Sequence, residues 1–500
     1  MSHKLDLSDV EREGDVSITQ QLVDRFAAAI DSGELEPGEK LPTTRALAAD
    51  AGVNHLTAAR VYRRLAEQGY VTATVGRGTF VRTLAPAPAT EEHGDDWQVY
   101  VLPDRPFSQA DQVLDDAFRL SGEPGIISLS TGFPSRETYP VKDLSRIAAK
   151  VFERGDGAAL DYLTAEGLPE LREQLAVRGR KIGWASDAEE IIVTSGARQA
   201  LDLTARALLD PRDVAVIESP TFVGWLSSLR STGARVIGVP YDTEGLDLDA
   251  LEEILARHEV KVVALQTASQ NPTGNDMSPE RRERLARLAM ERNFFIVEDG
   301  VYADLRFEGQ PGRPLRELAP GHVIYVSSLS KTVGGGLRIG WIAARGPVFE
   351  RIARLKLDAD FFTSAVTQHI AAGFLEAGDY DGLLESSSRF YRERRDAMME
   401  SLDRHLTGEY QAAAPKGGHH IWVTLNRPVD ERAFYAEAVR HGVTYVPGAT
   451  VVPDRPSETN LRLSFSLGDP PQHDEGVRRI ARALREMRRR DRRTATVPLS

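Results

Sequence analysis

The chain has 500 residues, a formal net charge of −12 and 41% hydrophobic residues. This length predicts more than one domain, the composition is typical of folded globular proteins, and the negative charge excludes a chain that coats nucleic acid through bulk charge. The absence of cysteine excludes disulfides and thiolate metal sites, and no metal site is predicted. No apolar run is long enough to span a bilayer, and residues 1–14 lack the apolar core of a signal peptide. We therefore expect a soluble, cytoplasmic protein without membrane contact.

Three short helices are predicted within residues 16–83. The first begins near residue 18 and carries an apolar side chain at every fourth position. Thr43 or Thr44 can cap the second helix, and Asn54 can cap the third, because short polar side chains accept hydrogen bonds from the first free amides of a helix.

A β-hairpin follows these helices, with strands expected over about 70–75 and 79–83. Three helices and a hairpin predict a winged helix-turn-helix, which reads DNA; the alternative is a unit that only packs or dimerises. Residues 40–82 hold seven basic and two acidic side chains, whereas residues 1–39 hold three basic and ten acidic, so a local basic patch favours DNA binding. We expect His55, Thr57, Ala58 and Arg60 on the outer side of the third helix. The candidate DNA contacts are Thr43, Thr44, Arg45, His55, Thr57, Ala58, Arg60 and Arg77.

The sequence of this domain resembles the GntR family of bacterial repressors almost from end to end. The matching stretches are 41–48, 52–65 and 67–81. This resemblance implies that the domain binds double-stranded operator DNA. A linker is predicted over 84–110, because its proline-rich start lacks helical or strand periodicity.

The block over 111–493 alternates short buried strands with amphipathic helices. This alternation predicts a mainly parallel sheet covered on both faces, with ligands gathered at the carboxyl ends of its strands. The expected strands are 191–194, 214–217, 262–265, 295–297 and 323–326.

Lys331 follows the last of these strands. Lysine occurs only nine times in the chain, so a lysine behind Ser328 and Ser330 and seven residues before Arg338 suggests a chemical role. A lysine amine forms a Schiff base with an aldehyde, which an arginine cannot do. This spacing predicts an anchor for pyridoxal phosphate, with Arg338 binding its phosphate.

The other strand ends also carry residues that suit this cofactor. The turn at Ala197 and Arg198 opens a helix, whose free amides can bind phosphate. Asp299 can keep a pyridine nitrogen protonated, Asn271 or Tyr302 can bond a phenolic oxygen, and Phe222 can stack on a flat ring. Each of these residues taken alone is more typical of a turn or a core.

Together, the order and spacing of these residues resemble the fold-type I aminotransferases. The match also includes the stretches around Gly132 and Tyr162 and the segment 460–466. The resemblance implies an α/β domain with a large subdomain built on a mainly parallel sheet and a smaller α+β subdomain. Two departures from the family pattern are Ala197 with Arg198, where a glutamine or hydroxyl residue is common, and Val451 with Val452, where an aromatic residue is common.

The resemblance implies a role for each matched residue. The catalytic set is Lys331, which carries the internal aldimine, Asp299, which pairs with the pyridinium, and Tyr302, which bonds the ring oxygen. The cofactor-binding set is Ala197, Arg198, Phe222, Asn271, Asp299, Tyr302, Ser328, Ser330, Lys331 and Arg338, with Tyr162 of the partner subunit. Arg462 is expected to bind the substrate carboxylate, and Gly132 to leave room for it.

A GntR domain joined to an aminotransferase-like domain is the organisation of the MocR subfamily, which the chain resembles over all but its two ends. The resemblance implies a head-to-tail homodimeric transcriptional regulator that senses an amino acid or amine through aldimine formation at Lys331. The alternative is an active aminotransferase that carries a DNA-binding module. The stretch from Val113 to Pro134 resembles aminotransferases acting on aminoadipate, kynurenine or branched-chain substrates, and the transaminase site is complete.

Residues 478–493 hold nine arginines and predict a terminal amphipathic helix with a solvated face. Auxiliary contact with DNA is the alternative interpretation of this face.

Overall fold

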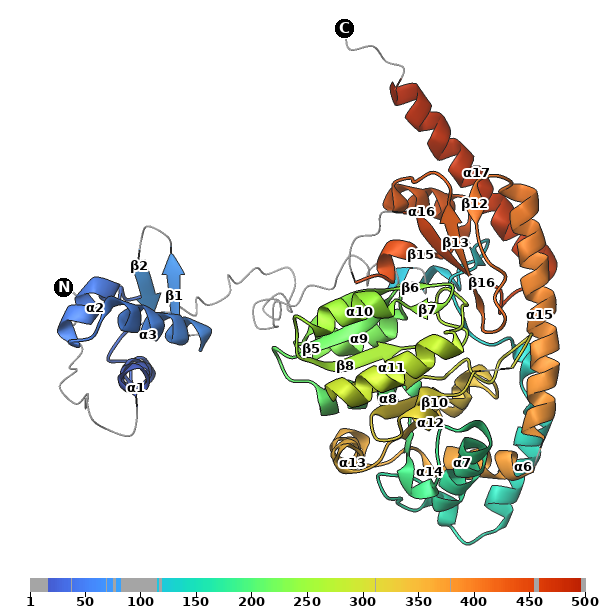
Figure 1. Ribbon diagram of the computed structural model, residues 1–500, viewed down its shortest axis with the longest axis horizontal. Helices are drawn as coiled ribbons and strands as arrows, with labels where there is room; N and C mark the ends of the chain where they lie inside the picture. Colours follow the sequence, from blue (N-terminus) through green and yellow to red (C-terminus); the bar gives the residue numbers. More distant parts are fainter. Residues whose placement is uncertain are drawn as a thin grey trace, which may run out of the picture. The chain divides into compact units, whose positions relative to one another are not determined.

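The computed structural model divides into two units, residues 1–106 and 107–500 (Figure 1). The residues that it describes are 17–36, 38–68, 70–74, 78–81, 115–116, 119–310, 312–377, 379–453 and 458–495. The expected linker over 84–110 and the candidate DNA contact Arg77 lie outside the described residues. Among the described helices, none is long and apolar enough to cross a membrane.

The N-terminal unit is a three-helix structure with a hairpin, as the sequence predicted. Its elements are α1 (Ile18–Asp31), α2 (Thr44–Asp50), α3 (His55–Glu67), β1 (Val71–Thr74) and β2 (Gly78–Val81). Thr43 and Asn54 cap α2 and α3: Thr43 Oγ1 accepts from the amide of Ala46 at 3.2 Å, and Asn54 Oδ1 from that of Thr57 at 2.7 Å. The core contains Leu22, Phe26, Leu47, Ala58, Val61, Tyr62 and Leu65.

The second unit is built on an eight-stranded sheet of order β4-β11-β10-β9-β8-β5-β6-β7. The strands are β4 (Ile191–Thr194), β5 (Val214–Ser219), β6 (Arg235–Asp242), β7 (Gly245–Leu246), β8 (Val260–Leu265), β9 (Phe295–Asp299), β10 (Val323–Ser328) and β11 (Gly340–Ala343). The strands from β10 to β6 are parallel, whereas β11 is antiparallel to both β10 and β4. The sheet is therefore mainly parallel, with antiparallel pairs toward its edges.

Side chains of the central strands are buried on both faces of this sheet. One face packs on α8 (Ala197–Leu208), α9 (Val223–Ser231) and α13 (Pro347–Asp360). The other packs on α10 (Leu248–Leu255), α11 (Pro279–Arg292), α12 (Leu315–Leu318), α6 (Val141–Glu153), α7 (Pro169–Ile182) and α14 (Ala365–Glu376). Burial on both faces explains why these strands are continuous apolar runs.

A smaller subdomain follows the sheet in sequence. Its four strands, β12 (Tyr410–Gln411), β13 (His420–Leu425), β16 (Asn460–Ser464) and β15 (Val446–Pro447), are antiparallel. They share a core with α15 (Tyr380–His405), α16 (Glu431–Arg440) and α17 (Pro470–Ala495). A short parallel pair, β3 (Ile127–Ser128) with β14 (Val443–Thr444), joins the start of this unit to the smaller subdomain.

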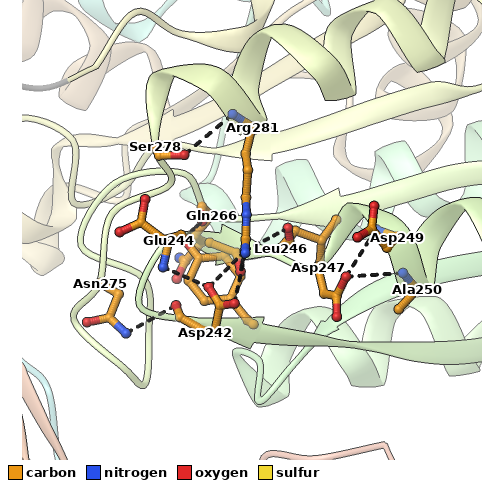
Figure 2. A network of polar contacts seen from close by, with 12 residues as sticks. Asp242, Glu244, Leu246, Asp247, Asp249, Ala250, Gln266, Asn275, Ser278 and Arg281 are labelled. Atoms are coloured by element: carbon orange, nitrogen blue, oxygen red, sulfur yellow. Dashed lines mark hydrogen bonds and ion pairs between the residues drawn. The ribbon is translucent and has the colours of Figure 1, made fainter.

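Two neighbouring arginines of α11 hold the strand ends in different ways. Arg281 is the more exposed of the two, and its guanidinium forms two hydrogen bonds with Asp242, at 2.7 and 2.9 Å, and also donates to the carbonyl of Gly245 (Figure 2). Arg282 is buried, and it donates to the hydroxyl and carbonyl of Thr267 and lies 3.9 Å from Glu298. Arg282 therefore ties α11 to the loop after β8 and to β9.

Arg282→Ala should lower the free energy of unfolding of the large unit by about 3–5 kcal/mol, because the substitution leaves Glu298 and several carbonyl groups buried without their partner. Urea denaturation followed by the fluorescence of Trp184, Trp225, Trp341 and Trp422 measures this change. The control is Arg284→Ala on the same helix, whose ion pairs with Asp249 and Glu252 are exposed and should contribute less than about 1 kcal/mol. Equal losses in the two variants would contradict the structural role of Arg282.

Candidate functional site

A cavity of about 470 Å³ opens where the strands of the large sheet end. Ten of the predicted site residues line it: Ala197, Arg198, Phe222, Asn271, Asp299, Tyr302, Ser328, Ser330, Lys331 and Arg338. They lie at or after the ends of β4, β5, β8, β9 and β10, so strand ends that are far apart in sequence meet at one place.

One end of the cavity is rich in hydrogen-bond donors. Arg338 has a positive φ of 55°, and its Nη2 donates to the carbonyl of Ser195 at 2.7 Å beside the start of α8. A Cβ atom on Gly196 would lie 2.5 Å from that nitrogen, so any other residue would displace the Arg338 guanidinium. The Ser330 hydroxyl is buried without a hydrogen-bond partner in the described part of the chain. This end can bind an anion.

The other end of the cavity holds the buried carboxyl of Asp299. Its Oδ2 accepts from Nε2 of Gln266 at 2.9 Å, and its Oδ1 accepts from the amide of Val301 at 3.1 Å. Burial raises the pKa of Asp299 to about 6, although these hydrogen bonds favour the charged form. A protonated ring nitrogen is a suitable partner for this carboxyl.

Gln266 also orients Asn271, since Oε1 of Gln266 accepts a hydrogen bond from the backbone amide of Asn271 at 2.6 Å. One side chain thus positions two of the predicted cofactor contacts. Our interpretation of the sequence missed Gln266, although it is the first residue after β8 and therefore lies at a strand end.

Lys331 lines the same cavity. Its Nζ donates to the carbonyl of Gly132 at 2.8 Å and sits 5.5 Å from the centre of the Tyr302 ring. Burial lowers the pKa of Lys331 to about 8, and the charge of Arg462 acts in the same direction while Asp299 opposes it. The amine is therefore more readily neutral, and nucleophilic, than an exposed lysine.

Arg462 reaches the site from β16 of the smaller subdomain. It donates to Oδ1 of Asn271 at 3.1 Å and to the carbonyl of Ser130 at 2.5 Å, and its buried Nε has no partner among the described residues. Burial lowers the pKa of Arg462 to about 10. A carboxylate that reached this guanidinium would gain a charge-assisted hydrogen bond.

Two buried histidines that the sequence interpretation missed complete this side. His420 Nε2 lies 3.1 Å from the Tyr302 hydroxyl, and His419 Nδ1 lies 3.2 Å from the carbonyl of Gly132. A carbonyl can only accept, so Nδ1 of His419 carries the proton. Burial lowers the pKa of His419 to about 3 and that of His420 well below its ordinary range, so both rings are neutral. The feature of the sequence that could have indicated them is two adjacent histidines, His419 just before β13 and His420 at its first position.

The reason for glycine at position 132 differs in part from the expectation. A Cβ atom there would lie 2.3 Å from Cε1 of His420, so the imidazole fills the space next to Gly132.

Tyr162 is 85% exposed, packs edge-on against Phe362 and is absent from the lining of the cavity. Its contribution from a partner subunit stays a prediction.

The predicted DNA contacts separate into exposed and buried side chains. Arg45, His55 and Arg60 are exposed. Thr43, which caps α2, is also exposed. Thr44 and Thr57 are partly buried. Ala58 is fully buried in the helical core, so its predicted place on the outer side of α3 is wrong: it lies three residues before Val61 and seven before Leu65, on the inward stripe. Leu56, which the sequence interpretation passed over, is 75% exposed beside His55.

Comparison with known proteins agrees with this geometry. The family described as aminotransferase class I and II matches residues 124–480. The chain belongs to this family. Residues 18–81 match the bacterial regulatory proteins of the gntR family.

Relatives with both domains cover nearly the whole chain. The uncharacterized HTH-type transcriptional regulator YisV of Bacillus subtilis is 31% identical, over 95% of this chain and 98% of its own. The probable rhizopine catabolism regulatory protein MocR of Rhizobium meliloti is 27% identical, over 95% of each chain. The chain is thus a GntR-type regulator fused to an aminotransferase domain and is homologous to MocR-type regulators.

Among solved structures, LysN, the alpha-aminoadipate aminotransferase of Thermus thermophilus, is 32% identical with a TM-score of 0.70. The match covers 79% of this chain and 99% of LysN, whose structure contains N-(5'-phosphopyridoxyl)-L-leucine.

The lowered pKa of Lys331 should be visible in its chemical reactivity. In protein stripped of bound aldehyde with hydroxylamine, labelling of Lys331 by trinitrobenzenesulfonate should rise through pH 8, because only the neutral amine reacts. Arg462→Gln should move this midpoint to higher pH, since it removes a neighbouring positive charge. Mass spectrometry of the labelled peptides measures both profiles.

The matched control is Arg389→Gln, on an exposed position of α15, and Lys142 is the exposed reference amine. An unchanged midpoint in the Arg462 variant would show that this charge does not act on Lys331.

Proposed function

We propose that this protein is a pyridoxal phosphate-binding transcriptional regulator that senses an amino acid or amine at Lys331. The observation that carries the proposal is the single cavity that joins Lys331, Asp299 and Arg338 in a chain that also has a GntR domain. We also propose that it acts in the cytoplasm, where operator DNA is found.

The donor set of the cavity fits pyridoxal phosphate. The phosphate would be held by Arg338, by the Ser328 and Ser330 hydroxyls and by the start of α8, where Ser330 Oγ has no partner among the described residues. Asp299 would face the ring nitrogen, and Asn271 and Tyr302 the ring oxygen. Pyridoxal phosphate supplies an aldehyde that condenses with amines and a ring that withdraws electrons.

The chain's own residues would handle the effector. Nζ of Lys331, with its pKa lowered to about 8, can accept or donate a proton near neutral pH and would hold the aldehyde of the cofactor. Arg462 would hold a carboxylate of the effector, and neutral His420 holds the Tyr302 hydroxyl. Burial of these groups keeps water from competing for them.

Regulation requires that the effector bind one conformation of the protein more tightly than another, because a ligand with equal affinity for both shifts no equilibrium. Arg462 and His420 come from the smaller subdomain, whereas Lys331 and Asp299 come from the large sheet. An effector that contacts both sets would favour one spacing of the subdomains, and this supports a sensing role.

We further propose a homodimer in which Tyr162 completes the partner's site. Three exposed apolar side chains support this: Tyr162, Leu160 and Phe361 are 85%, 73% and 61% exposed. Large apolar side chains that gather on a surface are typical of protein interfaces.

The second candidate function is aminotransferase activity. The specific observation in its favour is that Lys331, Asp299, Asn271 and Arg462, which such activity needs, all meet in the structure. Relatives that cover the second unit include a 2-aminoadipate transaminase of Thermus thermophilus, 34% identical.

One optical experiment tests the cofactor and separates the two functions. Purified protein with pyridoxal phosphate should show a visible absorption band that Lys331→Ala lacks, because the substitution removes the amine. A band that shifts with one amino compound and stays shifted supports a sensor. A band that is lost with an amino acid and returns with a 2-oxo acid makes the protein an aminotransferase, and no band in the unmodified protein would overturn the assignment of Lys331.

Arg60→Ala should weaken binding to an operator selected from random duplexes by about fivefold or more, because an arginine contact with a base is worth about 1–3 kcal/mol. Fluorescence anisotropy measures the affinity. Arg25→Ala is the control, since Arg25 of α1 pairs with Glu34 beyond the end of that helix and is not a candidate contact. Unchanged binding by the Arg60 variant would remove Arg60 from the interface, and a wild-type protein that selects no operator would overturn the regulator.

A further inference from the structure

The C-terminal helix α17 is held firmly by its apolar side. Val477, Ile480, Leu484 and Met487 are buried in the core that α17 shares with α15 and α16. Figure 1 shows that its last turns run beyond the strands of the smaller subdomain. The match to the aminotransferase family ends at residue 480, so most of the arginines of α17 follow the matched region.

One group of these arginines has structural partners. Arg478 and Arg479 both pair with Glu475, and Arg488 pairs with Glu409. Arg479 also donates to the carbonyls of Gly125 and Gly442, at 2.8 and 2.7 Å. The contacts of Arg479 and Arg488 hold α17 against the subdomain, and Arg478 pairs within the helix, so a structural role accounts for all three.

A second group lacks such partners. Arg482, Arg485 and Arg489 are exposed, and none forms a hydrogen bond or ion pair with any residue that the structure describes. Their spacing of three and four residues places them on one side of α17, in a row about 10 Å long at 1.5 Å per residue. We call these three residues the arginine face.

The arginine face borders a concave surface. Arg482 and Arg485 line a cavity of about 410 Å³ together with Arg440 from the end of α16 and with Arg478 and Arg479. Glu475 is the only acidic residue in this lining, and Arg478 and Arg479 already pair with it. The surface therefore has an excess of guanidinium groups that can accept an anion.

We propose that the arginine face is a second DNA-contacting surface, which holds the phosphate backbone of duplex DNA. A row about 10 Å long exceeds one small anion, whereas duplex DNA presents a negative charge about every 1.7 Å of its axis. Such contacts add affinity without base specificity. The chain as a whole is acidic, with a net charge of −12, so contact with DNA is confined to local basic surfaces such as this one.

This inference rests on the proposed DNA binding by the winged helix and adds an attachment point on the other unit. If both units bind DNA, an effector that changes how they are arranged would change the affinity of the regulator for DNA.

The test uses the full-length protein and a random-sequence duplex of about 40 base pairs, with affinity measured by anisotropy from about 50 to about 200 mM KCl. R482Q/R485Q/R489Q should weaken binding about tenfold or more at low salt and reduce the slope of log affinity against log salt by about 2–3, since each phosphate contact contributes about 0.9. R482K/R485K/R489K keeps the charges and should keep most of the slope. The tryptophan-detected urea midpoint verifies that the variants fold.

The matched control is R351Q/R389Q/R392Q, which removes the same charge from exposed positions of α13 and α15 that have no described ion pair. An equal loss in this control, or an unchanged slope in R482Q/R485Q/R489Q, overturns the arginine face while wild-type binding stands. Tighter DNA binding by R482Q/R485Q/R489Q also overturns it. A wild-type protein that binds no duplex overturns both this inference and the proposed DNA binding.

Discussion

The site depends on one constraint, the parallel alignment of β5, β8, β9 and β10. Parallel strands end at a common edge, and helices must cover both faces of such a sheet. Residues from five separate stretches therefore meet in one cavity. Arg282 stabilises this edge of the sheet, since it links α11 with Thr267 and lies beside Glu298, the residue before Asp299.

Burial is the second organising effect, because it shifts Lys331, Asp299 and the two histidines toward their neutral forms. Lys331 loses its proton more easily, Asp299 holds one more readily, and the two histidines stay uncharged. The Lys331 amine can thus gain or lose a proton near neutral pH, while Arg338 and Arg462 remain available for anions.

The two subdomains divide the chemistry between them. The large sheet supplies Lys331 and Asp299 with Gln266, and the smaller sheet supplies Arg462 and His420. Hydrogen bonds join the two sets, from Arg462 to Asn271 and between Tyr302 and His420. A ligand held by both sets is sensitive to their spacing, and the same geometry serves either a sensor or an enzyme.

The sequence by itself determined the two domains, the helix caps and five strands of the large sheet, because caps and continuous buried runs are local patterns. It also placed ten cavity residues, since strand ends in a parallel sheet converge whatever the intervening helices. The tertiary structure alone revealed Gln266, His419 and His420 as site residues and Ala58 as core. Whether a single polar or small side chain faces a cavity or the interior depends on the exact register of its helix or strand, and packing of distant segments sets that register.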